Sequence, residues 1–219
     1  MECLDAMGSD LGPLYDLLKY ECHTLHVDWA EFEVLFGASP ERIDLLNEAA
    51  AEFFGRLQDA HFERVLLLVA RLVDPPSSAG KSNATLCRLP QVVDPQIRPK
   101  IEILLNIAKN ECAFAQDWRN RHIAHRDLDL ALNRSAMPLD PASRLNVKRA
   151  LSAIVEVLNA VELHYCSDCT VGYEITHSPL GAIALLDVLE AGVDARKAEM
   201  ERMMSGKFSP SDFAPKLAI

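Results

Sequence analysis

Proline follows serine or aspartate at six places in the chain, and at four of them a long segment with a helical apolar pattern comes next. The four pairs are Ser39-Pro40, Asp94-Pro95, Asp140-Pro141 and Ser178-Pro179. A serine or aspartate side chain at a helix N-cap accepts a hydrogen bond from an unpaired backbone N–H, and proline at the first helical position has no N–H to leave unpaired. The pairs therefore predict four helix starts, and Gly12-Pro13 predicts a fifth.

The spacing of apolar residues extends these starts into five long helices. We expect them over residues 11–36, over 40–73, from 95 through Arg119, from 141 through Val161, and over 179–204, with one short helix within 85–93. The Ser-, Gly- and Pro-rich stretch 75–83 is predicted to be a loop. The expected fold class is therefore all-α. We assign residues 1–177 to a helical bundle, 178–206 to a C-terminal helix packed on it, and 207–219 to a mobile tail.

Composition limits the environment and the partners of the chain. Its 219 residues are enough for one domain with a sizeable core, and no apolar run approaches the roughly 18 residues that a membrane span needs. The first residues lack the basic and apolar regions of a signal peptide, so we expect a cytoplasmic protein, with no membrane association and with its six cysteines as thiols. A net charge of −10 argues against a general nucleic-acid-coating surface, but allows a local basic site.

The segment 118–127, Trp-Arg-Asn-Arg-His-Ile-Ala-His-Arg-Asp, is the strongest candidate for such a site. It places three arginines, Arg119, Arg121 and Arg126, within eight residues. Arginine offers a planar fork of donors that matches phosphate oxygens, and histidine is the side chain whose ordinary pKa suits proton transfer near neutral pH. We therefore predict a phosphate-directed site with Arg121 and Arg126 as substrate-binding residues.

Helical geometry leaves the histidine open. Six residues separate the positions of Arg119 and His125, which puts them about 120° apart on an ideal helix, whereas Arg119 and His122 share a face. Either the helix ends or bends near Ala124 and turns His125 back, or two copies of the segment form one site across a two-fold axis. His122 thus stays a rival to His125.

The motif also resembles a known family. Arg119-Asn120 followed by Ala124-His125-Arg126-Asp127, together with the upstream stretches Arg71 to Pro75, Gly80 to Asn83 and Thr85-Leu86, is similar to the AbiU-type branch of the HEPN domains. The resemblance covers roughly residues 10 to 165. It implies a HEPN-like helical bundle that dimerises, with a link to abortive phage infection and toxin-like roles.

The resemblance also implies a chemistry. HEPN ribonucleases cut RNA without metal, through attack of the 2′-hydroxyl on the adjacent phosphate. By this resemblance His125 is the general acid or base, Arg119 holds the scissile phosphate, and Asn120 orients one of them, with His122 as a second catalytic candidate. Lys81, in the expected loop, is a further residue that could touch RNA. No metal and no cofactor is implied.

The implied partners are a second copy of the chain, RNA, and an antitoxin or phage-derived protein. The alternative is a catalytically silent HEPN-like module that binds a nucleotide or a protein partner, or that only dimerises. Catalysis requires Arg119 and His125 to converge in one polar cleft, within a dimer if needed. A silent module would keep these side chains apart, or engage the arginine with a neighbouring carboxylate such as Asp117 or Asp127.

Other patterns in the chain are weaker. Gly80-Lys81-Ser82 lacks the upstream glycine and the preceding strand of a phosphate-binding P-loop. Cys166 and Cys169, with His164 nearby, have no second pair of ligands to complete a zinc site. His23 and His26 share a helix face but lack the Glu-x-x-His pairs of di-iron bundles, which favours packing.

Overall fold

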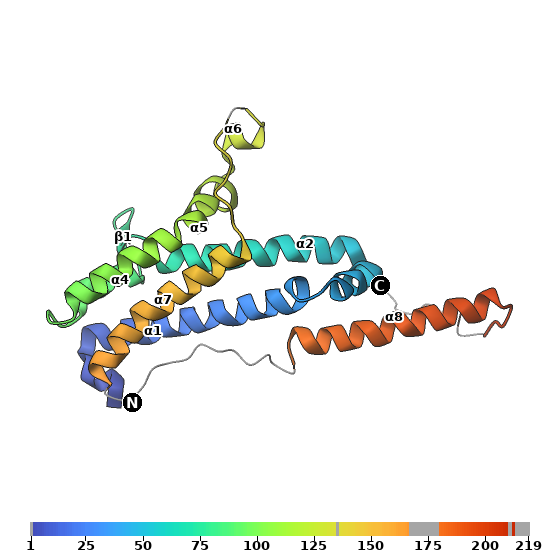
Figure 1. Ribbon diagram of the computed structural model, residues 1–219, viewed down its shortest axis with the longest axis horizontal. Coiled ribbons are helices and arrows are strands. Elements are labelled where there is room, and N and C mark those ends of the chain that lie inside the picture. Colours follow the sequence, from blue (N-terminus) through green and yellow to red (C-terminus); the bar gives the residue numbers. More distant parts are fainter. Residues whose placement is uncertain (1, 135, 167–179, 210–211, 213–219) are drawn as a thin grey trace. The chain divides into compact units, whose positions relative to one another are not determined.

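The computed structural model describes residues 2–134, 136–166, 180–209 and 212, which hold eight α-helices and one two-stranded hairpin (Figure 1). The predicted all-α fold class is confirmed. The chain forms two compact units, one of residues 1–30 and 59–176, the other of 31–58 and 177–219. Within the described residues, no helix is long and apolar enough to cross a membrane.

Four long helices form the core of the first unit. They are α1 (Glu2–Phe32), the C-terminal half of α2 (Pro40–Leu72), α4 (Arg98–Glu111) and α7 (Arg144–Tyr165). In Figure 1, α4 and α7 lie side by side and run in opposite directions. Apolar residues at helical spacing on all four helices are buried and form the core, among them Leu18 and Leu25 of α1, Val65 and Val69 of α2, Ile101 and Leu105 of α4, and Ile154 and Leu158 of α7.

A small hairpin replaces part of the loop that the sequence predicts after α2. Strands β1 (Ser77–Ser78) and β2 (Lys81–Ser82) pair in antiparallel fashion. Ala79 and Gly80 between them both have positive φ, of 46° and 76°, as the two central residues of a type I′ turn require. The short helix expected within 85–93 is present as a 3₁₀ turn (Leu86–Arg88) followed by α3 (Leu89–Val92).

The second unit combines the π-helical turn η1 (Glu33–Gly37), the N-terminal half of α2 and α8 (Ala182–Met204). Its core joins Leu35, Leu46 and Phe54 to Leu186 of α8. The Glu31 carboxylate accepts a hydrogen bond from the backbone N–H of Ala182 and so caps α8 from a distant part of the chain. The domain boundary after residue 177 stays a prediction, and the predicted mobile tail 207–219 lies largely outside the described residues.

The predicted helix starts hold to different degrees. α2 begins at Pro40, as its Ser-Pro pair predicts, whereas α1 begins near the chain start and only kinks, at Gly8, before Pro13. α4, α7 and α8 begin three residues after the expected prolines. For α7 the cap is Ser143, whose hydroxyl accepts from the N–H of Asn146 at 3.2 Å. The starts predicted at Asp94-Pro95 and at Asp140-Pro141 are therefore both three residues too early, and Ser178-Pro179 lies outside the described residues.

An ion pair crosses the first unit between α1 and α7. Lys19 Nζ lies 2.9 Å from Glu162 Oε1, and the Glu162 side chain is only 6% exposed, against 37% for Lys19. A buried carboxylate that loses its only cation keeps its desolvation cost without compensation. The pair therefore makes Lys19 important for stability.

We expect Lys19→Met to lower the free energy of unfolding by about 2 kcal/mol, less than the loss for a fully buried pair because Lys19 is partly open to water. Urea denaturation measures this change. The matched control is Arg56→Met, which removes the partner of Glu52 from a pair whose side chains are 79% and 94% exposed and should cost under about 0.5 kcal/mol. Equal losses in the two variants would contradict the assignment.

Candidate functional site

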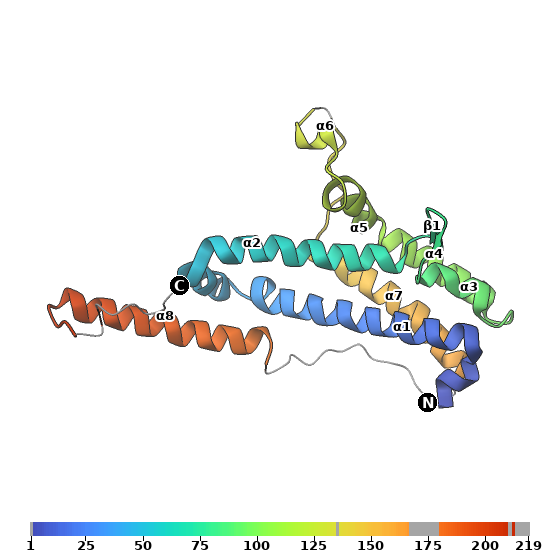
Figure 2. The same ribbon diagram turned by 180° about the vertical axis from the view of Figure 1, so that it is seen from behind.

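The Arg119 motif occupies a π-helical turn at the end of a broken helix. α4 ends at Glu111, α5 (Ala113–Trp118) continues after Cys112, and the π turn η3 spans Arg119–Ile123. The N–H of Ala124 donates to the carbonyl of Arg119 at 2.8 Å, a bond across five residues that widens the turn. The helix therefore ends at Ala124, as one of the two predicted resolutions requires. Figures 1 and 2 show the chain leaving the helices there toward α6 (Leu128–Ala131).

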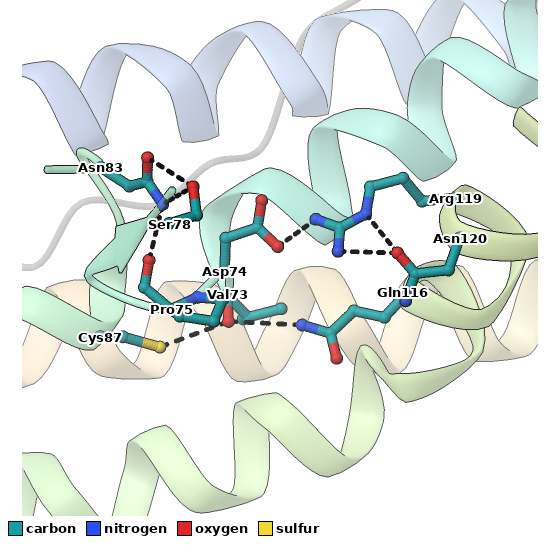
Figure 3. Close-up of polar contacts among 9 residues, drawn as sticks. All are labelled: Val73, Asp74, Pro75, Ser78, Asn83, Cys87, Gln116, Arg119 and Asn120. Carbon is teal, nitrogen blue, oxygen red and sulfur yellow. Dashed lines mark hydrogen bonds and ion pairs between the residues drawn. The ribbon is translucent and has the colours of Figure 1, made fainter. Parts of the chain in front are cut away.

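Arg119 is held on two sides (Figure 3). Its Nη1 forms an ion pair with Asp74 just past the end of α2, and both side chains are about one-fifth exposed, at 21% and 20%. Its Nε and Nη2 donate to the Asn120 side-chain oxygen at 3.1 and 2.9 Å. A guanidinium carries five N–H donors, so these three bonds within the described structure leave two for a ligand.

Asp74 is the residue that the sequence interpretation missed. The prolines Pro75 and Pro76 that follow Asp74 are a local signal that ends a helix, and α2 does end at Leu72. A helix stop does not tell which residue the carboxylate meets, because its partner lies 45 positions away in the sequence. Asp74 lies in the stretch from Arg71 to Pro75 that resembles the family, but the sequence alone assigns it no function.

Arg121 has several partners within its own segment. Its Nη1 lies 3.2 Å from Asp117 Oδ1 and 3.4 Å from the Pro138 carbonyl, its Nη2 donates to the Met137 carbonyl, and its Nε is 3.9 Å from Asp127. These contacts join the segment that leads back from α6, at Met137 and Pro138, to the π turn. The guanidinium predicted to bind substrate is therefore engaged in holding this segment.

His122 packs back toward α2. Its Nε2 lies 3.3 Å from Glu63 Oε1, and its ring meets Trp118 edge-on at a centroid distance of 5.4 Å. Trp118 in turn packs against Phe62 and donates its indole N–H to the Asp140 carbonyl at 2.8 Å. His122 is 35% exposed in this setting, so it can reach solvent while its partners fix its ring.

His125 and Arg126 lie beyond the helix end and are exposed. Within the described part of one chain, no hydrogen bond or ion pair joins Arg119 to His125. Lys81 is exposed on β2 of the hairpin that follows Asp74. The structure thus brings together Arg119 and Asn120, and leaves His125, Arg126 and Lys81 open to solvent.

The other ionisable clusters show no ligand chemistry. Among the described residues, no group of three or more His, Cys, Asp or Glu side chains is placed to hold a metal ion. Burial lowers the pKa of His26, whose Nδ1 hydrogen-bonds to the Cys22 carbonyl at 2.8 Å. Burial also raises the pKa of the Cys112 thiol to about 12.

The expectation that all six cysteines are thiols is wrong. Cys166 is disulfide-bonded, whereas Cys22, Cys87 and Cys112 are free and buried. Cys169, the other member of the Cys-x-x-Cys pattern, lies outside the described residues.

Comparison with known proteins gives one match. The sequence model of the HEPN family described as AbiU2 matches residues 8–179, which is most of the chain and includes Asp74 and the whole Arg119 motif. No curated protein and no solved structure matches the chain significantly.

The contacts of Arg121 generate a structural prediction. We expect Arg121→Ala to release the 128–140 segment from the π turn, because the variant loses contacts to Asp117 and to two carbonyls of the segment that leads back from α6. Backbone amides in this segment should then exchange with deuterium faster than in the wild type, while those of α7 should be unchanged. The exposed Arg126 provides the control, and Arg126→Ala should leave exchange as it is. Unchanged exchange in Arg121→Ala would show that the clamp is unimportant.

Proposed function

The chain belongs to the AbiU2 family of HEPN domains, and on that premise we propose that it is a metal-independent endoribonuclease, acting as a toxin or phage-defence effector, whose site is completed by a second copy of the chain. The observation that carries the proposal is the state of Arg119 and His125. Arg119 is fixed with two N–H donors left over, and His125 is exposed beyond the end of the same π turn.

The proposed reaction uses only groups of the RNA and of the protein. The 2′-hydroxyl attacks the adjacent phosphorus, the bond from phosphorus to the 5′-oxygen breaks, and the products are a 2′,3′-cyclic phosphate and a 5′-hydroxyl. His125 takes the proton of the 2′-hydroxyl or supplies one to the leaving 5′-oxygen. Arg119 donates to the phosphate oxygens as negative charge builds on them in the transition state.

A second copy supplies what one chain lacks. Since no hydrogen bond or ion pair joins Arg119 to His125 in the described part of one chain, the proposal takes Arg119 from one copy and His125 from the other. Three large apolar side chains on the segment just after His125 are exposed and support a protein partner there: Leu128 at 65%, Leu132 at 48% and Met137 at 78%. The exposed Arg126 and Lys81 are the proposed contacts to the RNA backbone.

One observation favours the alternative, a silent HEPN-like binding or dimerisation module. Arg119 and Arg121 each already face a carboxylate, Asp74 and Asp117. Ion pairs of this kind can be purely structural, and an arginine that serves only its own fold needs no substrate. Activity separates this function from the proposed one.

We expect the purified chain to cleave cellular RNA in excess EDTA and to leave 2′,3′-cyclic phosphate ends. His125→Ala should slow cleavage by about 100- to 10,000-fold, the usual contribution of a general acid or base. His122→Ala tests the rival histidine, and a larger loss there than in His125→Ala would transfer the role to His122.

The control for these variants is His23→Ala, since His23 is exposed like His125 but lies on α1, and its loss should not change the rate. RNA binding without cleavage by the wild type would favour the silent module. Cleavage that persists in both His122→Ala and His125→Ala would contradict the proposed chemistry.

A further inference from the structure

Asp74 touches Arg119 from an element far away in the sequence. It lies two residues after the end of α2, and its Oδ1 accepts from Arg119 Nη1 (Figure 3). On the other side of the guanidinium, Nε and Nη2 share the Asn120 oxygen. The guanidinium is therefore hydrogen-bonded at two edges by two different parts of the chain, which fixes the orientation of its plane as well as the position of its charge.

The backbone that carries Asp74 is itself anchored. The carbonyl of the preceding Val73 accepts from Gln116 Nε2 at 3.4 Å and from the buried Cys87 thiol at 3.3 Å (Figure 3). Gln116 belongs to α5, the helix that leads into the motif. The end of α2 is thus bonded to the motif helix through Val73 as well as through Asp74, so the carboxylate has little freedom to move away from Arg119.

The chain after Asp74 is also held. Asn83 Nδ2 donates to the Pro75 carbonyl at 2.9 Å, and Arg88 Nη1 donates to the Pro76 carbonyl at 3.2 Å. These bonds fix both residues that follow Asp74. A carboxylate with anchored backbone on either side is preorganised, which is what the orientation of a second group requires.

We propose that Asp74 is a positioning residue, which holds the Arg119 guanidinium in one orientation so that its two remaining N–H groups meet the scissile phosphate. This inference rests on the proposed function. It contrasts with a masking role, in which Asp74 would merely neutralise Arg119 and compete with the phosphate. Two features favour positioning, because masking needs neither of them. Asn120 accepts two further hydrogen bonds from the guanidinium, and two N–H groups of Arg119 remain for the phosphate.

The test compares two substitutions that remove the same charge. Asp74→Ala removes the acceptor, whereas Asp74→Asn keeps an oxygen that Arg119 Nη1 can donate to. We expect single-turnover cleavage to fall by about 10- to 100-fold in Asp74→Ala, the scale of a misplaced catalytic contact, and by clearly less in Asp74→Asn. Since both variants lose the carboxylate charge, the difference between them reports the positioning alone.

A double-mutant cycle shows whether Asp74 acts through Arg119. In an Arg119→Ala background, Asp74→Ala and Asp74→Asn should cleave at the same rate, because there is no guanidinium to orient. The two Asp74 variants, each with and without Arg119→Ala, are also compared for their affinity to a 2′-O-methyl RNA, which cannot be cleaved. We again expect Asp74→Ala to bind this RNA more weakly than Asp74→Asn, and we expect the difference to disappear in the Arg119→Ala background.

Asp28→Ala is the matched structural control. Asp28 Oδ2 forms an ion pair with Arg64 Nε at 2.7 Å in the same unit, and its side chain is 20% exposed, like that of Asp74. This variant loses a comparable pair without touching the motif, so its cleavage and binding should match the wild type.

Five outcomes overturn the inference or its premise. Faster cleavage by Asp74→Ala would establish masking instead. Equal behaviour of Asp74→Ala and Asp74→Asn, or a difference that survives in the Arg119→Ala background, would remove the positioning role. A wild type that binds the RNA but never cleaves it would overturn the proposed ribonuclease and leave the affinity cycle to decide on Asp74, and a wild type that neither binds nor cleaves would overturn both.

Discussion

The ion pair between Asp74 and Arg119 is the contact on which the arrangement of the motif depends. It joins the end of α2 to the π turn that follows α5, and so fixes where the first residue of the motif lies. Arg121 then holds the segment around α6 in place, through its contacts to Asp117 and to the carbonyls of Met137 and Pro138. His125 is exposed because the helix has ended one residue before it.

The pairing also explains how an acidic chain can carry three arginines so close together. The sequence suggests a local cationic patch, but Asp74 and Asp117 each take one guanidinium, and within the described residues only Arg126 of the three has no such partner. The positive potential offered to a phosphate is therefore small and directional. Recognition of RNA would then depend on oriented donors at a few positions more than on a broad field.

Much of the fold could be predicted from the sequence, because apolar spacing and proline mark helices locally. The long helices α1, α2, α7 and α8 followed from such local signals, whereas the third expected helix is broken at Cys112 into α4 and α5. The start of α7 did not, since Asp140 binds Trp118 through its carbonyl and leaves the cap to Ser143. The π turn and the contact between Asp74 and Arg119 were not predicted for a related reason, because both depend on long-range packing that no short sequence pattern encodes.

The most direct test mixes two strongly impaired variants, Arg119→Ala and His125→Ala. If each site takes Arg119 from one copy and His125 from the other, a mixed dimer contains one site with both residues intact and one with neither. Since half of the dimers are mixed after full exchange, cleavage should return to about a quarter of the wild-type rate. If the mixture stays as inactive as either variant alone after verified exchange of subunits, the two residues do not act across a dimer, and the account is wrong.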